Sequence, residues 1–533
     1  MSKLGLALSG GGFRAAFFHV GVLARLAELD LLREVEVIST VSGGSIAGAL
    51  YYLRLRQLLE DKSAAELTQE DYLALVHDVE ERLRRGVQKN IRARVFANLP
   101  KNAQMLVSRR YSRTDRVGDL YDRHFYKKAW GEKREKRFLR WEKQIELRNL
   151  LIEPKGSAGL ERDQVNSDRS KDKVPALVIN ATSLNSGHNW RFEAVRMGEA
   201  LPEDDRERDL VREIDKNMRL EQGYFKSKYF GPPEGAPVIP DAQADFPLAL
   251  AVAASAAVPG IFHPLTIGDL YEDIRVQLVD GGVQDNQGIQ ALEDQGCERM
   301  VISDASGQMA DLERPLAIAP TTLIRTESVA EDRIRDEQLV HWGDEEFAPV
   351  HLRMGLEPEC IPPLGNAKKR DKQRPAGKTA FGVAYEVQDL LSRIRTDLDY
   401  FSDTEAYALE MNGYMLATRK VEGEPGKGQA DGRWPFLPMR RKLEEPDDVF
   451  LAELRAGQKK FLRAFELQPA RATAATIVLL GPLLLLALLA FRPGGWLRHR
   501  SLPEKAGVLA LAGFLLLSAW SNLKPRMPWL YRR

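Results

Sequence analysis

The chain has 533 residues, 44% hydrophobic and 29% charged, with a formal net charge of +1. This length exceeds one compact core and predicts two or three structural units, and the composition excludes a largely disordered chain. The near-zero charge gives no reason to expect nucleic acid as a partner. Cys297 and Cys360 are the only cysteines, which excludes a disulfide framework or a zinc cluster and fits a reducing compartment.

The N-terminal part of the chain predicts two strand–turn–helix units. Each begins with a short apolar run, continues into a glycine-rich turn and ends with apolar side chains at helical spacing. Such units form right-handed crossovers between parallel strands. We therefore expect an α/β fold with a mostly parallel central sheet flanked by helices. The predicted elements are a strand at residues 4–8, a helix at 15–32, a strand at 35–40 and a helix at 46–58.

Two charged insertions interrupt this pattern, and a helical region follows it. The first insertion carries a basic run at residues 84–94, where a solvated helical insertion is favoured over a membrane-facing cap. An alanine-rich helix is expected at 246–258, and further strands at 176–180, 189–192, 276–279 and 300–303. The predicted units are an α/β domain at residues 1–330 with helical insertions at about 60–173 and 201–240, a helical extension packed on it at 331–467, and a helical hairpin at 468–533.

The C-terminal hairpin has the features of a membrane anchor. Residues 472–491 and 506–523 contain no charged side chain, and Trp496, Trp520 and Trp529 lie near their ends. Runs of this length can cross a hydrocarbon core, and tryptophan is typical of the interface. We expect two membrane spans, with a buried helical hairpin as the alternative. Because the first apolar run ends at once in glycines, it does not fit a signal peptide, and we expect a membrane-associated protein whose body is cytoplasmic.

The first glycine-rich turn, Gly10-Gly11-Gly12, permits two interpretations. It satisfies the spacing of a dinucleotide-binding loop, but the second strand ends in Ser39-Thr40 and supplies no acid to hold a ribose. The alternative is an oxyanion hole, in which successive N–H groups at a helix N-terminus converge on a developing negative charge.

The second turn favours the oxyanion hole. Ser42 directly follows a strand and opens a helix, which is the setting of a nucleophile elbow, and the N–H of Gly43 can join the oxyanion hole. Thr40 stands where this motif usually has its first glycine. Ser45 is the alternative nucleophile in a competing frame. In the least demanding interpretation, both serines only cap the helix.

A serine nucleophile needs a base, and the histidines are few. His19 falls on a predicted core helix and His263 in a loop. Asp280 is better placed, because a strand carries it to the sheet edge, where Gly281 and Gly282 allow close approach. A partly desolvated carboxylate in contact with the serine can act as the base without an imidazole.

Three motifs together give the chain a resemblance to the patatin-like phospholipase family. They are Gly10-Gly-Gly-Phe-Arg14, Ser42-Gly-Gly-Ser45 and Asp280-Gly-Gly282, and the segment 254–264 also resembles that family. The first two lean towards its cytosolic phospholipase A2-like branch. The resemblance implies a catalytic Ser42–Asp280 dyad and an oxyanion hole at Gly10, Gly11, Gly12 and Gly43, supported by Arg14, Gly281 and Gly282.

The resemblance also implies a function. The implied reaction needs no calcium, other metal or cofactor in its core chemistry. Arg14 would steady the glycine loop or bind the lipid phosphate. We expect a membrane-tethered serine acyl-hydrolase that acts on phospholipid or lysophospholipid. A catalytically silent lipid-binding scaffold is the alternative, and a nucleotide-dependent oxidoreductase is the third possibility.

Overall fold

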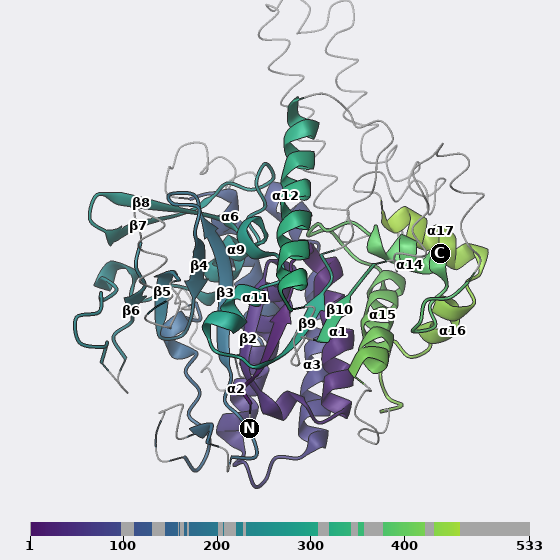
Figure 1. Ribbon diagram of the computed structural model, residues 1–533, viewed down its shortest axis with the longest axis horizontal. Helices are drawn as coiled ribbons and strands as arrows, with labels where there is room; N and C mark the ends of the chain where they lie inside the picture. The colour runs from purple at the N-terminus through teal and green to yellow at the C-terminus, as the bar shows by residue number, and fades with distance from the viewer. Residues whose placement is uncertain are drawn as a thin grey trace, which may run out of the picture.

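The computed structural model contains a central sheet surrounded by helices (Figure 1). Where the structure describes the chain, the helices and strands that the sequence predicts are present, although several begin or end at other residues than predicted. The residues that the structure describes are 2–97, 111–130, 144–157, 159, 165–167, 170–200, 206, 220–227, 231–306, 319–342, 350–355, 377–421 and 431–458.

Among the described residues, the sheet has ten strands in the order β10-β9-β1-β2-β3-β4-β5-β6, with β8 also paired to β3 and β7 paired to β8. The strands are β1 (Leu4–Leu8), β2 (Val35–Val41), β3 (Ala176–Ser183), β4 (Asn189–Phe192), β5 (Arg196–Glu199), β6 (Gly223–Tyr224), β7 (Leu265–Tyr271), β8 (Ile274–Asp280), β9 (Arg299–Asp304) and β10 (Val350–Arg353).

The predicted α/β fold is confirmed, and the two glycine-rich turns follow strands in the parallel part of the sheet. Strands β10, β9, β1, β2 and β3 are mutually parallel. Beyond β3, all the pairs are antiparallel, so the sheet is mixed. Leu8 of β1 is in register with both Thr40 and Ser303. The turns that follow these strands therefore meet at one edge of the sheet.

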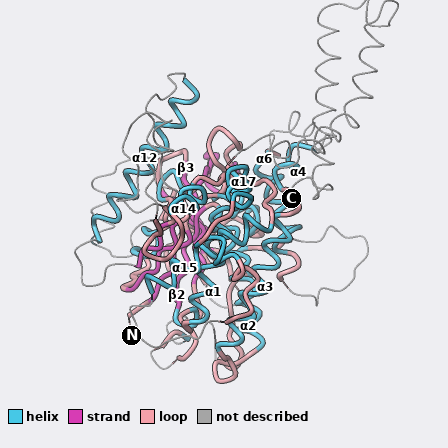
Figure 2. The backbone as a smooth tube through the Cα atoms, turned by 90° about the vertical axis from the view of Figure 1, so that its right-hand side faces the viewer, coloured by secondary structure: helices cyan, strands magenta, loops and turns pink. Residues whose placement is uncertain are grey.

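The helices cover both faces of the sheet. Figure 2 shows the strands between α12 on one side and α1, α2 and α3 on the other. The helices are α1 (Gly12–Glu28), α2 (Gly43–Asp61), α3 (Gln69–Val87), α4 (Ile91–Ala97), α6 (Arg113–Tyr121), α9 (Leu248–Ser255), α10 (Gly282–Asp285), α11 (Ile289–Asp294), α12 (Ala319–Trp342), α14 (Tyr385–Ser392), α15 (Asp403–Val421), α16 (Met439–Glu444) and α17 (Asp448–Gly457). Short helical turns are η1 (Leu32–Glu34), η2 (Asp122–Tyr126), η3 (Leu147–Asn149) and η4 (Asp241–Gln243).

Two hydrophobic cores follow from the alternation of side chains along the strands. On β1, Leu6 and Leu8 belong to the large core that also contains the buried residues of α1 and α2. The intervening Ala7 belongs to a smaller core with Ile289 and Leu292 of α11. Successive side chains of a strand point to opposite faces, so the sheet is buried on both faces, as parallel sheets usually are.

The local bounds differ from the predicted ones for identifiable reasons. Helix α1 starts at Gly12 and stops at Glu28, because Asp30 has a left-handed φ of 59° that the helix cannot continue through. Helix α9 is shorter than the predicted 246–258 and begins directly after Pro247, whose backbone is extended. Arginines of the predicted basic run form ion pairs with acidic side chains. For example, Arg84 Nε lies 2.8 Å from Glu80 Oε1.

Helix α15 of the predicted extension packs backbone-to-backbone on α1. A side chain at Gly21 would overlap the carbonyl oxygen of Glu410, and one at Gly413 would overlap the carbonyl oxygen of Phe18. At the end of α1 the fully buried Glu28 accepts hydrogen bonds from Tyr414 and Trp434, among others. Glycine therefore sets the distance between these two helices.

The predicted membrane segments, 472–491 and 506–523, lie outside the described residues, as do most residues of the 201–240 insertion. Within the ranges that the structure describes, no helix combines the length and the apolar character that a membrane span needs.

Candidate active site

Ser42 occupies a strained turn between β2 and α2. Its φ of 49° and ψ of −112° lie outside the regions that ordinary residues prefer. A side chain at Gly43 would overlap the backbone of Gly12, and one at Gly44 would overlap the carbonyl oxygen of Leu8. The two glycine-rich turns therefore face each other in contact, and Ser42 is held above the sheet as in a nucleophile elbow.

Asp280 ends β8 and lies directly against Ser42. Ser42 Oγ donates a hydrogen bond to Asp280 Oδ2 at 2.8 Å, and Gly282 N donates to Oδ1 at 2.9 Å. Strand β8 brings the carboxylate there by pairing antiparallel with β3, where Asp280 is opposite Ala181. Both partners of the pair are buried, each with 6% of its surface exposed.

Burial, with a smaller contribution from the charge of Glu327 on α12, raises the pKa of Asp280 to about 7. The hydrogen bonds from Gly282 and Ser42 oppose this shift because they stabilise the charged form. A carboxyl group with a pKa near neutrality can take a proton from a serine and return it later. The pair thus has the geometry and the pKa that a nucleophile and its general base need.

Three of the four predicted oxyanion-hole residues present suitable N–H groups. The backbones of Gly12 and Gly43 are in contact, and Gly11 is the N-cap of α1. Within the described part of the chain, the N–H groups of Gly11, Gly12 and Gly43 make no hydrogen bond. Donors at the N-termini of α1 and α2 can stabilise an oxyanion there.

Gly10 departs from the prediction. Its N–H donates to the carbonyl oxygen of Asn286 at 2.9 Å, so that donor is occupied. A side chain at Gly10 would also overlap Asn286 Oδ1. Gly10 therefore provides close packing beside the elbow rather than an oxyanion donor.

Arg14 is a structural anchor of the glycine-rich turn. Its Nη1 donates to the carbonyl oxygens of Ser392 and Ile394, and its Nη2 to those of Ala305 and Ser306, at 2.6 to 3.0 Å. Only 4% of its surface is exposed, and burial lowers its pKa to about 10. Of the two predicted roles, the structure favours steadying the loop, because the guanidinium group is buried and donates to backbone carbonyl oxygens.

Gly281 and Gly282 permit close packing around Asp280. A side chain at Gly281 would overlap the carbonyl oxygen of Asn180, and one at Gly282 would overlap Asn286 Oδ1. The close approach predicted for these two glycines is therefore by protein groups.

Ser45, the alternative nucleophile, is fully buried and fully occupied. Its Oγ donates to Thr40 Oγ1 at 3.0 Å and lies 2.9 Å from Ser255 Oγ. Thr40 Oγ1 in turn donates to the carbonyl oxygen of Val178 at 3.0 Å. Thr40 therefore fits under the elbow, and Ser42 still adopts the strained turn although the usual glycine is missing.

Ser255 was not singled out by the sequence reasoning, although it contacts the elbow. Its Oγ accepts a hydrogen bond from Ser42 N at 2.9 Å. Ser255 lies in the segment 254–264, which resembles the family, and this resemblance could have indicated that it contributes to the site.

Histidine takes no direct part in the pair. His19 is buried on α1, where burial lowers its pKa to about 4. Its Nδ1 lies 2.6 Å from Ser303 Oγ and its Nε2 lies 2.9 Å from the carbonyl oxygen of Ser9. Among the described residues, no histidine is hydrogen-bonded to Ser42 or Asp280.

Two further aspartates near the sheet edge have structural roles. Asp285 accepts hydrogen bonds from the backbone N–H groups of Gln287, Gly288 and Gln290 at the start of α11. Asp304 accepts from Ser306. Both carboxylates therefore cap backbone N–H groups of turns.

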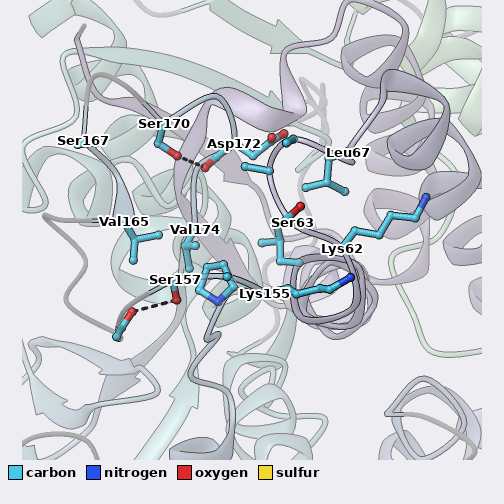
Figure 3. Close-up of a pocket in the computed structure, with 16 residues that line it drawn as sticks. Lys62, Ser63, Leu67, Lys155, Ser157, Val165, Ser167, Ser170, Asp172 and Val174 are labelled. Atoms are coloured by element: carbon cyan, nitrogen blue, oxygen red, sulfur yellow. Dashed lines mark hydrogen bonds between the residues drawn. The ribbon is translucent and has the colours of Figure 1, made fainter.

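A cavity of about 500 Å³ lies away from this site, where α2 ends and the chain enters β3 (Figure 3). Lys62, Ser63, Lys155 and Asp172 are among the residues that line it. Helix α2 has 19 residues and begins beside Ser42, so its far end is about 28 Å away. This cavity is therefore separate from the Ser42–Asp280 pair.

Comparison with known proteins places the pair inside a matched region. The family model described as patatin-like phospholipase matches residues 6–292, which include both turns and Asp280. No curated protein matches the chain.

Solved structures also resemble the chain at low identity, and 21 of their chains match it. The human GIVD cytosolic phospholipase A2 with methyl gamma-linolenyl fluorophosphonate and terbium chloride is 12% identical, at a TM-score of 0.36 over 79% of this chain and 58% of that one. The same human enzyme without these additions is 12% identical, at 0.34 over 79% and 61%. VipD from Legionella pneumophila is 11% identical, at 0.23 over 100% and 92%. The chain thus spans about three fifths of the human structures.

Proposed function

The chain belongs to the patatin-like phospholipase family, and from this membership and the contact between Ser42 and Asp280 we propose that it is a serine hydrolase of lipid acyl esters. The observation that carries the proposal is the 2.8 Å hydrogen bond from Ser42 Oγ to Asp280 Oδ2. Phospholipids or lysophospholipids are the proposed substrates.

In the proposed mechanism, Ser42 Oγ attacks the ester carbonyl carbon while its proton moves to Asp280 Oδ2. The N–H groups of Gly11, Gly12 and Gly43 stabilise the oxyanion of the tetrahedral intermediate. As this intermediate collapses, Asp280 returns the proton to the departing alcohol, which leaves an acyl-enzyme on Ser42. Water then attacks the acyl-enzyme, with Asp280 again taking and returning a proton, and releases the fatty acid.

A fluorophosphonate probe tests the nucleophile. We expect the purified protein to be labelled and Ser42→Ala to take no label. Ser45→Ala should still be labelled, but at a lower rate. Labelling that survives in Ser42→Ala and disappears in Ser45→Ala would assign the nucleophile to Ser45. A folded wild-type protein that takes no label would support the silent lipid-binding scaffold instead.

Lipid analysis tests the base and the substrate class. Asp280→Asn keeps the shape of the side chain but removes the proton acceptor, and loss of a general base lowers rates about 10²- to 10⁴-fold. We expect free fatty acid to form from mixed phospholipids with the wild type and to fall by that factor with Asp280→Asn. Equal product from both proteins would refute the dyad.

We also propose that residues 472–491 and 506–523 tether the enzyme to the membrane that holds its substrate, with the body in the cytoplasm. The support is the absence of charge over both segments. Arginine at the centre of a span is unfavourable by about 2.5–3.5 kcal/mol. Leu485→Arg with Leu515→Arg should therefore release the protein from membranes in alkaline carbonate, whereas the matched Leu485→Ala and Leu515→Ala should not. Protease digestion of sealed vesicles tests whether the body of the protein lies on the cytoplasmic side of the membrane.

A further inference from the structure

Three buried hydroxyl groups link the backbone of Ser42 to strand β3. Ser42 N donates to Ser255 Oγ at 2.9 Å, and Ser255 Oγ lies 2.9 Å from Ser45 Oγ. Ser45 Oγ donates to Thr40 Oγ1 at 3.0 Å, and Thr40 Oγ1 donates to Val178 O at 3.0 Å. The three hydroxyl-bearing residues, which we call the hydroxyl chain, are fully buried.

The direction of every hydrogen bond in the hydroxyl chain is fixed. A hydroxyl group has one proton to donate. Thr40 uses its proton on Val178 O, and Ser45 uses its own on Thr40. Ser255 must therefore donate to Ser45, which leaves its lone pairs to accept the Ser42 N–H. Each group donates once and accepts once, so no member of the hydroxyl chain is left unsatisfied.

Ser255 also contacts the other half of the active site. It is the last residue of α9, and its carbonyl oxygen accepts a hydrogen bond from Gly281 N at 3.3 Å. Two residues later, the carbonyl oxygen of Ala257 accepts from Asp280 N at 3.1 Å. The end of α9 thus holds the backbone on both sides of the dyad, with its side chain on Ser42 and its main chain on Gly281 and Asp280.

From this geometry we propose that Ser255 is a positioning residue, which, through the hydroxyl chain with Ser45 and Thr40, holds the Ser42 elbow in its reactive conformation and fixes its distance to Asp280. The physical reason is that a residue at φ 49° and ψ −112° keeps this conformation only if its surroundings hold it. The Ser42 N–H has Ser255 Oγ as its partner, and a buried N–H without a partner is strongly disfavoured.

The inference rests on the proposed function, because the reactive conformation matters only if Ser42 is the nucleophile. A displacement of about 1 Å at a reacting group can reduce the rate about 10²-fold. We therefore expect Ser255→Ala to lower kcat for a soluble p-nitrophenyl ester by roughly 10- to 100-fold, while KM changes less than about twofold and the midpoint of the pH profile is unchanged. The rate of fluorophosphonate labelling should fall by the same factor.

Thr379→Val is the matched control. Thr379 is also buried, and its Oγ1 also accepts a backbone N–H, from Val383 at 3.1 Å, but it lies outside the hydroxyl chain. This variant loses a similar hydrogen bond and should keep kcat. If Ser255→Ala and Thr379→Val lower kcat equally, or only in proportion to the folded fraction, the positioning role is wrong.

Thr40 provides a second test that does not depend on Ser255→Ala folding. Thr40→Val removes the hydroxyl and keeps the shape, whereas Thr40→Ser keeps the hydroxyl. We expect lower kcat in Thr40→Val and near wild-type kcat in Thr40→Ser. Because the groups act in series, Ser255→Ala with Thr40→Val should lose no more than Ser255→Ala alone. If the fold-losses of kcat in the two single variants multiply in the double variant, the hydroxyl groups do not act as a connected chain. Equal kcat in Thr40→Val and Thr40→Ser would also refute the inference.

Hydrogen–deuterium exchange separates this inference from the proposed function. The amide of Ser42 should exchange faster in Ser255→Ala than in the wild type or Thr379→Val, whether or not the protein is catalytic. Wild-type protein that takes no label would defeat the proposed function, and the exchange rate would still test the elbow. Unchanged exchange at Ser42 would overturn the inference even if the wild type is fully labelled.

Discussion

Ser42 Oγ and Asp280 Oδ2 are 2.8 Å apart although 238 positions separate the two residues in the chain. Strand β2 delivers the serine from a parallel pair, and β8 delivers the aspartate from an antiparallel pair with β3. Val41 and Asp280 are in register with neighbouring residues of β3, Asn180 and Ala181. One strand therefore sets the height of both groups, and their contact is a property of the sheet rather than of flexible loops.

The first prediction concerns the pH dependence of the rate. Only the ionised carboxylate of Asp280 can accept the Ser42 proton, and its pKa is raised to about 7. The rate should therefore rise as the pH rises through about 7, and fall about tenfold per pH unit well below that midpoint. The measurement is kcat/KM for a soluble ester between pH 5 and 9. A flat profile down to pH 5 would show that Asp280 is not the base.

A second prediction concerns Glu327 on α12. The negative charge of Glu327 contributes to the raised pKa of Asp280, so Glu327→Gln should move the midpoint of the profile to lower pH. Glu337→Gln is the control on the same helix, because Glu337 is exposed and pairs with Arg333. Equal midpoints in the two variants would argue against an electrostatic effect of α12 on the site.

The sequence predicted the two local turns of the site and the base Asp280, but not the distant groups that contact Gly10 and Arg14. A strand, a glycine-rich turn and a helix are encoded within a few residues, so the elbow at Ser42 could be anticipated. The loss of Gly10 as a donor depends on Asn286, and the role of Arg14 depends on carbonyl groups at 392 and 394. Nothing in the local pattern of the turn indicates those partners, because they are set by how distant segments pack.

The fold shows the same division. Apolar runs ending in glycine turns identified β1 and β2 as parallel strands, whose apolar pattern is continuous because both faces are buried, whereas the parallel strand β10 was not predicted. The antiparallel pairing of β8 with β3 could not be derived, since the spacing of apolar residues does not state which strand is the neighbour. That pairing is nevertheless what brings Asp280 to Ser42.

The third prediction concerns the contact between α1 and α15. A methyl group at Gly21 would overlap the carbonyl oxygen of Glu410, so Gly21→Ala must push the helices apart. Overpacking of this kind destabilises by about 1–3 kcal/mol, which chemical denaturation would measure. In Gly432→Ala the added methyl meets open space, and its stability should stay close to that of the wild type. Similar stability for both variants would contradict close backbone packing at Gly21.

The fourth prediction concerns Arg14. Lysine has one compact ammonium group and cannot reach both pairs of carbonyl oxygens that the guanidinium group joins. Hydrogen bonds from charged donors contribute about 1.5–3 kcal/mol each, so Arg14→Lys should lower the free energy of unfolding by about 2–4 kcal/mol. Arg333→Lys, at an exposed ion pair on α12, should change it by less than about 1 kcal/mol. An unchanged free energy of unfolding in Arg14→Lys would show that the four carbonyl contacts are not important for stability.

The fifth prediction concerns a buried acid in α15. Glu410 is fully buried, and neither of its carboxylate oxygens has a hydrogen-bond partner among the described residues. Burial is the largest cause that raises its pKa well above the ordinary value. The folded protein therefore holds a proton that the unfolded chain releases above a pH of about 4.3. Stability from this group is greatest below that pH and is lost as the pH rises, by about 1.4 kcal/mol per pH unit, until the pH reaches the folded pKa.

Glu410→Gln removes this ionisation and keeps the size of the side chain. Above about pH 5, the free energy of unfolding of the variant relative to the wild type should therefore increase by about 1.4 kcal/mol for each pH unit until the pH reaches the folded pKa of Glu410, as measured by chemical denaturation at each pH. Glu298→Gln, at an exposed position, should run parallel to the wild type. If the Glu410→Gln curve also runs parallel to the wild type, the Glu410 carboxyl group is ionised in the folded protein, and a partner must compensate its charge.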